Sequence, residues 1–272
     1  MSKSVVYVQF PKAGLGNMML TWSRAYVFSV LNNLEMCTSS WTKIHVGAML
    51  RNEKSYRLYF SYFIGTSFAK KVRFFLYRIF KKIVKEPSVQ KLENKSGNSL
   101  FYFHKIFTDY DFFKEIRPYK ETVRKGIDAI LHPALKIQFD EHPKPVIGIH
   151  IRRGDFKKGS TITPLSFFID VVKRLRQEAN EQLPVTIFTD AEKWEIDELM
   201  RLGNIQISPA KPDILDILLL ASSKVVVLSI GSTFSYWAAF LSTGTIIKNE
   251  KEWHVPFRDP LDNNFKDEIV WK

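Results

Sequence analysis

The stretch that decides the fold runs from Val146 to Phe156 and reads VIGIHIRRGDF. Its first half is a short apolar run rich in β-branched residues, which is typical of a buried strand. Its second half places two arginines, a glycine and an aspartate directly after that strand. Because ligands of open α/β sheets bind beyond the carboxyl ends of the strands, we expect the two guanidinium groups at a binding edge.

Arg152 and Arg153 are the candidates for a diphosphate clamp. A guanidinium group is planar, always charged, and offers paired N–H groups to phosphate oxygens. Strand alternation places His150 and Arg152 on one face and Arg153 on the other, unless the loop has already begun. Gly154 permits a tight turn at this point. A basic surface loop paired with acids explains the same residues equally well, so both interpretations are open.

Two further strand ends carry polar side chains. Ser232 and Thr233 follow an apolar run and precede a helical pattern, so they indicate either a phosphate site at a helix N-terminus or simple capping of that helix. Asp190 follows the apolar run at 185–189. It either binds ribose or base groups of a ligand or caps the next helix.

Beyond residue 132 the sequence alternates regularly between strand and helix patterns, which indicates a parallel sheet covered by helices. We expect an α/β protein with an N-terminal domain at 1–132 and a C-terminal domain at 133–272, joined by a proline-containing connector at 132–145. Strands are predicted at 145–151, 184–189, 204–207, 224–229 and 244–248, and helices over about 164–180, 192–202, 213–223 and 232–242.

The N-terminal part is less regular, and residues 38–68 show no clear pattern. We predict strands at 5–10 and 100–106 and helices at 18–34 and 121–131.

Residues 69–85 have helical spacing with an apolar face and a basic face that no acidic residue interrupts. Such a segment either lies in an anionic membrane surface or packs on its own domain with a solvated basic face. The apolar face would hold Val72, Phe75, Leu76, Ile79, Phe80 and Ile83, and the basic face Lys70, Lys71, Arg73, Arg78, Lys81, Lys82 and Lys85.

The bulk composition narrows the partners and the compartment. The 272 residues carry a net charge of +12, which favours an anionic partner: nucleic acid, an anionic membrane or a phosphorylated ligand. A single cysteine, Cys37, excludes an intrachain disulfide and favours a reducing compartment. We find neither a signal-peptide core nor an apolar run long enough to span a bilayer, so we expect a cytoplasmic protein.

Two other chemistries have weak support in the sequence. Asp109 and Asp111 flank Tyr110 in an Asp-x-Asp pattern that can hold Mg²⁺ or Mn²⁺, although a turn explains it as well. The six histidines are scattered and form no zinc motif. No nucleic-acid-binding module is recognisable, so we expect no nucleic-acid partner.

Together these segments resemble the fucosyltransferase superfamily with the His-x-Arg-Arg-x-Asp signature, and most of all the α-1,2-fucosyltransferase family. The departures from the family pattern are Ala13, the residues 18–20, and Gly231. The matching positions are Ile149 to Asp155, Ser232 to Leu241, the set Thr189, Asp190 and Trp194, the acid Asp216, and Gly14 to Asn17.

The resemblance implies a GT-B-like fold of two Rossmann-like domains facing a cleft, with the GDP-sugar held by the C-terminal domain and no metal. It implies inverting transfer of L-fucose from GDP-β-L-fucose to a glycan hydroxyl, in α-1,2 linkage, for surface polysaccharide biosynthesis. Arg152 and Arg153 would neutralise the leaving diphosphate, and Asp155 would act as the base or orient Arg152. Donor contacts are implied for Gly14, Gly16, Asn17, His150, Asp190, Asp216, Ser232, Thr233 and Phe234.

Alternatives stay open on the donor and on the class of protein. Another GDP-deoxysugar, such as a rhamnose or colitose donor, fits the same motifs. A basic lipid- or nucleic-acid-binding protein on an inactive transferase scaffold is the alternative of a different class. The acceptors considered include lipid-linked glycans, and segment 69–85 would then contact the cytoplasmic face of the membrane.

Overall fold

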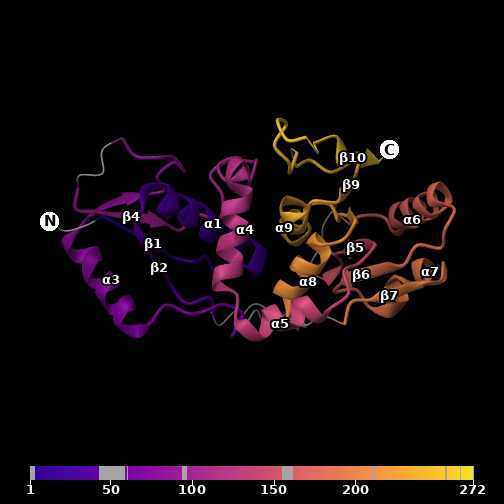
Figure 1. The fold of residues 1–272 in the computed structure, drawn as a ribbon, viewed down its shortest axis with the longest axis horizontal. Coiled ribbons are helices and arrows are strands. Elements are labelled where there is room, and N and C mark those ends of the chain that lie inside the picture. Colours follow the sequence, from indigo (N-terminus) through magenta and orange to yellow (C-terminus); the bar gives the residue numbers. More distant parts are fainter. Residues whose placement is uncertain are drawn as a thin grey trace. The chain divides into compact units, whose positions relative to one another are not determined.

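The computed structural model describes residues 4–42, 59, 61–93, 97–154, 162–209, 212–254, 256–263 and 265–271, apart from the side chains of residues 68 and 71. These residues form two compact units, 1–136 and 137–272, each built on a parallel sheet (Figure 1). The predicted α/β class is therefore confirmed.

The N-terminal unit has four parallel strands with helices on both faces. In spatial order the strands are β2 (Glu35–Thr38), β1 (Val5–Val8), β4 (Ser99–Phe103) and β3 (Lys82–Lys85). The helices are α1 (Leu15–Asn32), α3 (Phe68–Phe80) and α4 (Lys120–Ile130), with a short 3-10 turn, η1 (Arg117–Tyr119).

The two faces of this sheet are covered by different helices. Phe28 of α1 packs against Phe101 and Phe103 of β4. On the opposite face, Phe74 of α3 packs against Tyr7 of β1 in a cluster that includes the buried thiol of Cys37. Strand alternation thus sorts the side chains of β1 and β4 between α1 and α3.

The predicted helix over 69–85 is wrong beyond Phe80. The chain turns at Lys81 and continues as the edge strand β3. Ile83 and Val84 are β-branched and pair with Leu100 and Phe101 of β4, which suits a strand better than a helix. Ile83 has helical spacing from Ile79 and Phe80 in the sequence, but it lies in β3 and not in the helix.

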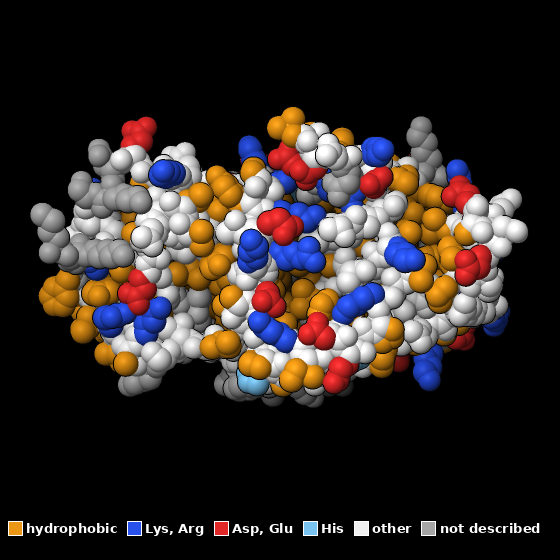
Figure 2. All heavy atoms as spheres, in the orientation of Figure 1, with side chains coloured by type: hydrophobic (Ala, Val, Ile, Leu, Met, Phe, Trp, Pro, Cys, Tyr) orange, Lys and Arg blue, Asp and Glu red, His pale blue; other side chains and the backbone are white. Residues whose placement is uncertain are grey.

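The sequence predicts that the basic residues of this segment share one solvated face, but they do not. The apolar face of the segment is also not the face that is buried. Lys81 is buried, and its ammonium group donates to Oδ1 of Asn98 over 2.6 Å. Phe74 of α3 is buried against the sheet, whereas five apolar side chains of the same helix are exposed: Val72, Phe75, Leu76, Ile79 and Phe80. Figure 2 shows such side chains gathered over α3.

The C-terminal unit has six parallel strands, with β5 in the interior of the sheet. In spatial order they are β10 (Glu268–Trp271), β9 (Thr245–Asn249), β8 (Val225–Val227), β5 (Ile147–Ile151), β6 (Val185–Thr189) and β7 (Ile205–Ile207). The helical elements are α6 (Leu165–Ala179), η3 (Lys193–Glu195), α7 (Asp197–Met200), α8 (Asp213–Ala221), α9 (Thr233–Leu241) and η4 (Phe265–Asp267).

Five strands and three helices of this unit lie where the sequence predicts them. The expected helix over 192–202 is instead split into η3 and α7, and the connector at 132–145 contains a helix, α5 (Pro133–Glu141). Pro133 is the first residue of α5, a position where proline is compatible with a helix start. Because the connector contains several prolines, its sequence indicates a loop rather than a helix. Among the described residues, no helix combines the length and the apolarity needed to cross a bilayer.

Gly244, in the turn before β9, offers a test of the packing. A Cβ atom at this position would lie 2.3 Å from the carbonyl oxygen of Lys224 and 2.4 Å from that of Ser223. Both contacts are backbone, so they cannot rotate away. We predict that Gly244→Ala lowers the free energy of unfolding by about 1–3 kcal/mol in urea titration.

The matched control is Gly65→Ala, because a Cβ at Gly65 meets nothing within 4 Å. Its unfolding should follow that of the parent protein. Equal stability of the two variants would show that the β8–β9 connection is not packed as described.

Candidate active site

Polar side chains converge where three neighbouring strands end. β8, β5 and β6 are adjacent and parallel, so their carboxyl ends meet at one edge of the sheet. Arg152 and Arg153 follow β5, Asp190 follows β6, and the segment 228–233 follows β8. The three motifs that the sequence analysis singled out are therefore brought together by the topology.

Asp190 fixes both arginines. Its Oδ2 atom lies 2.6 Å from Nη1 of Arg152, and its Oδ1 atom accepts a hydrogen bond of 2.7 Å from the backbone N–H of Arg153. A Cβ on Gly154 would come within 2.4 Å of Oδ2, so a larger residue there would push the Asp190 carboxylate out of this position. The Arg152 side chain is 29 % exposed, so part of its surface is accessible to a ligand.

Arg153 is held differently and is nearly buried. Its Nη1 donates to the carbonyl oxygens of Arg152 and Thr163 over 3.1 and 3.0 Å. Burial lowers the pKa of this guanidinium, and the nearby carboxylates of Glu195 and Asp190 act in the opposite direction. The two arginines are thus not equivalent, since Arg153 also braces the loop backbone.

His150 lies inside the site as a neutral group. Its Nδ1 atom is 2.6 Å from Oγ of Ser235, and its ring stacks on Phe234 with centroids 4.6 Å apart. Burial, followed by the charge of Arg152, lowers the pKa of His150 from 6.5 to about 3. The ring therefore carries no charge near neutrality and is a poor proton acceptor there.

Two serines connect the strand ends. Oγ of Ser229 donates to the carbonyl of His150 over 2.8 Å and accepts from the backbone N–H of Arg152 over 3.0 Å. Oγ of Ser235 accepts from the backbone N–H of Ser229 over 3.1 Å. Neither serine was among the predicted site residues, although Ser229 ends an apolar run and Ser235 lies within the matched motif.

The loop before α9 is held in place by Glu252, a carboxylate that no local sequence pattern singles out. Glu252 accepts from the backbone N–H of Gly231 over 3.2 Å and from the hydroxyl of Tyr236 over 2.6 Å. Gly231 has a φ of 69°, a left-handed conformation that suits glycine. Ser232 occupies the N-cap position of α9, yet its side chain makes no capping hydrogen bond. The capping interpretation of Ser232 is therefore wrong.

The remaining predicted residues lie elsewhere or outside the description. Asp155 lies outside the described residues. Asp216, in the first turn of α8, accepts from Oγ of Ser208 over 2.8 Å. Gly14 caps α1 in the N-terminal unit, where a Cβ would meet nothing within 4 Å. Packing of the chain itself thus does not require glycine there. Gly16 and Asn17 form the first turn of α1.

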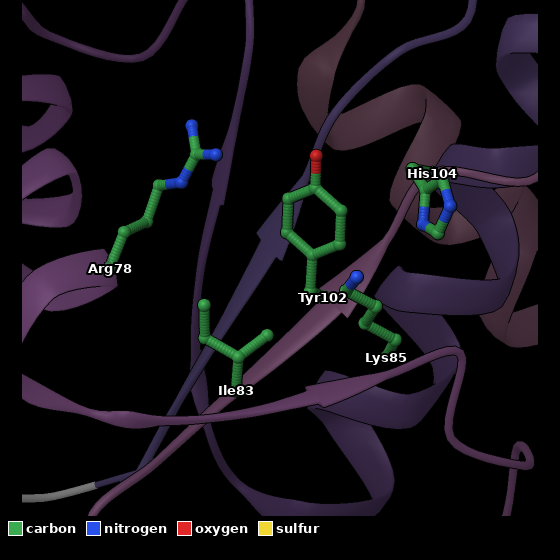
Figure 3. A pocket seen from close by; sticks show the side chains of 5 residues that line it. All are labelled: Arg78, Ile83, Lys85, Tyr102 and His104. Atoms are coloured by element: carbon green, nitrogen blue, oxygen red, sulfur yellow. The ribbon is translucent and has the colours of Figure 1, made fainter.

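The N-terminal unit has two open cavities on the α3 side of its sheet, of about 240 and 310 Å³. Arg78 borders both, and its guanidinium lies 5.8 Å from the ring of Tyr102. Figure 3 shows Arg78 reaching from the helix toward side chains of the strands. The first cavity is lined by Arg78, Ile83, Lys85, Tyr102 and His104, and the second by Tyr7, Thr38, Ser39, Ser40, Phe75 and Arg78.

The Asp-x-Asp pattern forms a turn whose carboxylates are paired with cations. Asp109 lies 2.6 Å from the ammonium of Lys114, and this hydrogen bond holds the pKa of Asp109 below its usual value. Both oxygens of Asp111 accept from Arg117 over 2.7 Å. In the described part of the chain, no group of three or more His, Cys, Asp or Glu side chains could hold a metal ion.

Comparison with solved structures identifies the fold. NodZ α-1,6-fucosyltransferase, soaked with GDP-fucose, shares 16 % identity over 92 % of this chain and 96 % of its own, with a TM-score of 0.54. Fucosyltransferase NodZ from Bradyrhizobium shares 15 % identity over 89 % of this chain and 94 % of its own, with a TM-score of 0.51. POFUT1 in complex with GDP-fucose shares 8 % identity over 88 % of this chain and 94 % of its own, with a TM-score of 0.53. The fold is that of a GT-B-type glycosyltransferase, as predicted.

The sequence match is more specific than the fold. The family model for glycosyl transferase family 11 matches residues 74–271, and the chain belongs to that family. The predicted family and the predicted enzyme class, a fucosyltransferase, are confirmed. A search of curated proteins finds no match.

The neutral state of His150 predicts a pH dependence of stability. In the unfolded chain His150 takes up a proton near pH 6.5, whereas in the folded protein its pKa is about 3. Between these values the unfolded state binds the proton, so stability falls as the pH is lowered through this window. We expect the parent protein to lose about 2 kcal/mol more than His150→Asn between pH 7 and pH 5 in urea unfolding.

The comparison with His150→Asn removes the contribution of other titrating groups. Identical losses for the two proteins would mean that His150 is protonated normally in the folded state.

Proposed function

We propose that this enzyme transfers L-fucose from GDP-β-L-fucose to a hydroxyl group of a glycan, with inversion at the anomeric carbon and without a metal ion. The observation that carries the proposal is the placement of Arg152. Asp190 holds its guanidinium at a sheet edge, and the N-terminus of α9 follows the neighbouring strand. A cation and a helix N-terminus at the same edge of a sheet suit a diphosphate.

The transfer would proceed by direct displacement. The acceptor hydroxyl oxygen forms a bond to C1 of fucose while the bond from C1 to the β-phosphate oxygen breaks, and GDP leaves with the electron pair. Negative charge therefore grows on the diphosphate in the transition state. Fixed positive groups aimed at that charge stabilise the transition state more than the ground state. Arg152 would supply this charge, with Arg153 fixing the loop that carries it.

The helix side of the donor site would add hydrogen bonds. Ser232 is the buried N-cap residue of α9 and Thr233 opens the helix, so we assign donation to the phosphate to their hydroxyl groups and to the amides of the first turn. Phe234 and His150 form a stacked, uncharged pair beneath this turn. We assign contacts with ribose or guanine to Asp216 and Asp190, and approach to the diphosphate to Gly14, Gly16 and Asn17.

The proton of the acceptor hydroxyl needs a base. His150 does not suit that task near neutrality because its pKa is about 3. Asp190 holds Arg152 and the backbone of Arg153. We therefore keep Asp155 as the candidate base, with orientation of Arg152 as its alternative role.

The acceptor sugar would occupy the cavities of the N-terminal unit. Tyr7 and Tyr102 stack with centroids 5.9 Å apart, and aromatic faces of this kind suit the apolar faces of sugar rings. Hydroxyl groups of Thr38 and Ser39 and the guanidinium of Arg78 supply hydrogen bonds. The cavity of about 310 Å³ is at the small end of the usual range for ligand pockets, about 300–1,000 Å³, and the cavity of about 240 Å³ lies below that range. One or two sugar units would suit it.

Finer assignments follow from the resemblance alone. We propose the α-1,2 linkage and a role in surface polysaccharide biosynthesis on that basis. Another GDP-deoxysugar remains the alternative donor, and comparison of donors in a binding assay separates the two. An acceptor carried by a lipid belongs to the same proposal.

Arg152→Ala tests the donor site. The variant loses a charged hydrogen-bonding group on the diphosphate, so we predict that GDP binds about 10- to 100-fold more weakly and that kcat falls as well. Calorimetric titration with GDP and a transfer assay measure the two effects.

Arg174→Ala is the matched control, since Arg174 lies in the same unit and pairs with Glu178 on the surface. It should bind GDP like the parent protein. Unchanged GDP affinity in Arg152→Ala would remove Arg152 from the donor site.

Arg78→Ala tests the acceptor cavities. We predict that KM for a soluble glycan acceptor, identified on a glycan array, rises about tenfold while GDP affinity is unchanged, because one hydrogen-bonding cation is lost from the cavity wall. Arg124→Ala, at an exposed position of α4, is the control. A change in GDP affinity instead of acceptor KM would contradict the assignment.

A further inference from the structure

The exposed face of α3 is apolar, which is the reverse of an ordinary surface helix. Phe74 and Tyr77 face the sheet and pack on each other with centroids 5.4 Å apart. On the other side of the helix five side chains are between 44 and 73 % exposed. They are Val72, Phe75, Leu76, Ile79 and Phe80, and Ile83 of β3 is exposed as well.

The spacing of these five residues makes them one continuous stripe. Successive members are alternately three positions and one position apart, so they lie on one side of the helix over about two turns. Large apolar side chains gathered in this way on a soluble surface mark an interaction site, whereas scattered single ones do not. Figure 2 shows them at the end of the N-terminal unit where Figure 1 places α3.

Positive charge lies along both edges of the stripe. In helical projection Arg73 lies next to Phe80 on one edge and Arg78 next to Phe75 on the other. Lys82 and Lys85 of β3 are exposed directly after the helix. Segment 69–85 contains no acidic residue.

One carboxylate from outside the segment reaches this rim. Glu35 of β2 pairs with Arg73 and, over 3.3 Å, with Lys70. Lys81 does not contribute to the rim because it is buried.

We propose that this α3 face, defined as the five apolar side chains of α3 with Ile83 and the surrounding cations, docks on an anionic lipid membrane. An amphipathic helix of this type lies in the plane of the membrane with its apolar side about 5–10 Å deep and its cations at the headgroups. A second copy of the chain fits the charge less well, because two such faces would bring their cationic rims together. An anionic surface satisfies both the apolar stripe and the rim.

Docking would bring the N-terminal cavities to the membrane surface. Phe75 belongs to the stripe and lines the second cavity, and Arg78 belongs to the rim and lines both. A glycan carried on a lipid would therefore reach the cavities without leaving the membrane. This consequence rests on the proposed function, whereas docking itself does not.

Co-sedimentation with vesicles tests the proposal. The vesicles are made of phosphatidylcholine alone or with about one third phosphatidylglycerol. We expect the protein to sediment with the anionic vesicles, to be released by raised salt, and to bind neutral vesicles much more weakly. Ile79→Ser/Phe80→Ser should lower the partition onto anionic vesicles about tenfold or more. Val72→Ser/Leu76→Ser, from the same stripe, should do the same.

The matched control removes two exposed apolar side chains elsewhere. Tyr110 and Leu261 are 86 and 92 % exposed, so Tyr110→Ser/Leu261→Ser should sediment like the parent protein. GDP titration of every variant shows whether it is folded and keeps the donor site separate from docking. Vesicle binding without GDP binding would support docking and contradict the proposed function.

Two results would overturn the proposal. One is absence of the parent protein from the anionic vesicle pellet. The other is a concentration-dependent dimer in analytical ultracentrifugation that Ile79→Ser/Phe80→Ser abolishes, together with no vesicle binding, which would assign the α3 face to a second copy.

Discussion

The carboxylate of Asp190 ties two strand ends together at the carboxyl edge of the C-terminal sheet. It reaches across from the end of β6 to the side chain of Arg152 and the backbone of Arg153, both beyond the end of β5. A side chain at position 154 would displace this carboxylate, because Oδ2 of Asp190 lies where its Cβ would be. A guanidinium that is oriented before a ligand arrives loses less conformational entropy on binding, so this one interaction turns a mobile cation into a preorganised one.

The same edge shows how charge is distributed by burial. His150 is enclosed and neutral, Arg153 is nearly enclosed and satisfied by backbone carbonyls, and Arg152 keeps an accessible surface. The side chains that contribute to the net charge of +12 are therefore not equally accessible to a ligand. In our account this charge serves two anionic partners, a diphosphate at the C-terminal sheet edge and a membrane at α3.

The sequence was most informative where local patterns decide structure. Buried parallel strands have uninterrupted apolar runs in their sequence, so β5 and its neighbours could be predicted. The motif residues directly follow these strands, so their positions could be predicted as well. Three-dimensional partners could not be placed in this way. Glu252 lies in a later turn of the chain and accepts from the backbone N–H of Gly231. No local sequence pattern predicts this contact. Likewise, the helical spacing of 69–85 hid the edge strand β3, and periodicity could not tell which face of α3 the sheet would cover, because tertiary packing decides it.

The measurement that tests the central claim most directly is calorimetric titration of the purified protein with GDP, GDP-fucose and GDP-mannose in the presence of EDTA. A diphosphate site built from Arg152 and the N-terminus of α9 requires no metal, so GDP and GDP-fucose should bind in EDTA and GDP-mannose should bind more weakly. Absence of guanine-nucleotide binding, or binding that returns only with Mn²⁺, would contradict the account.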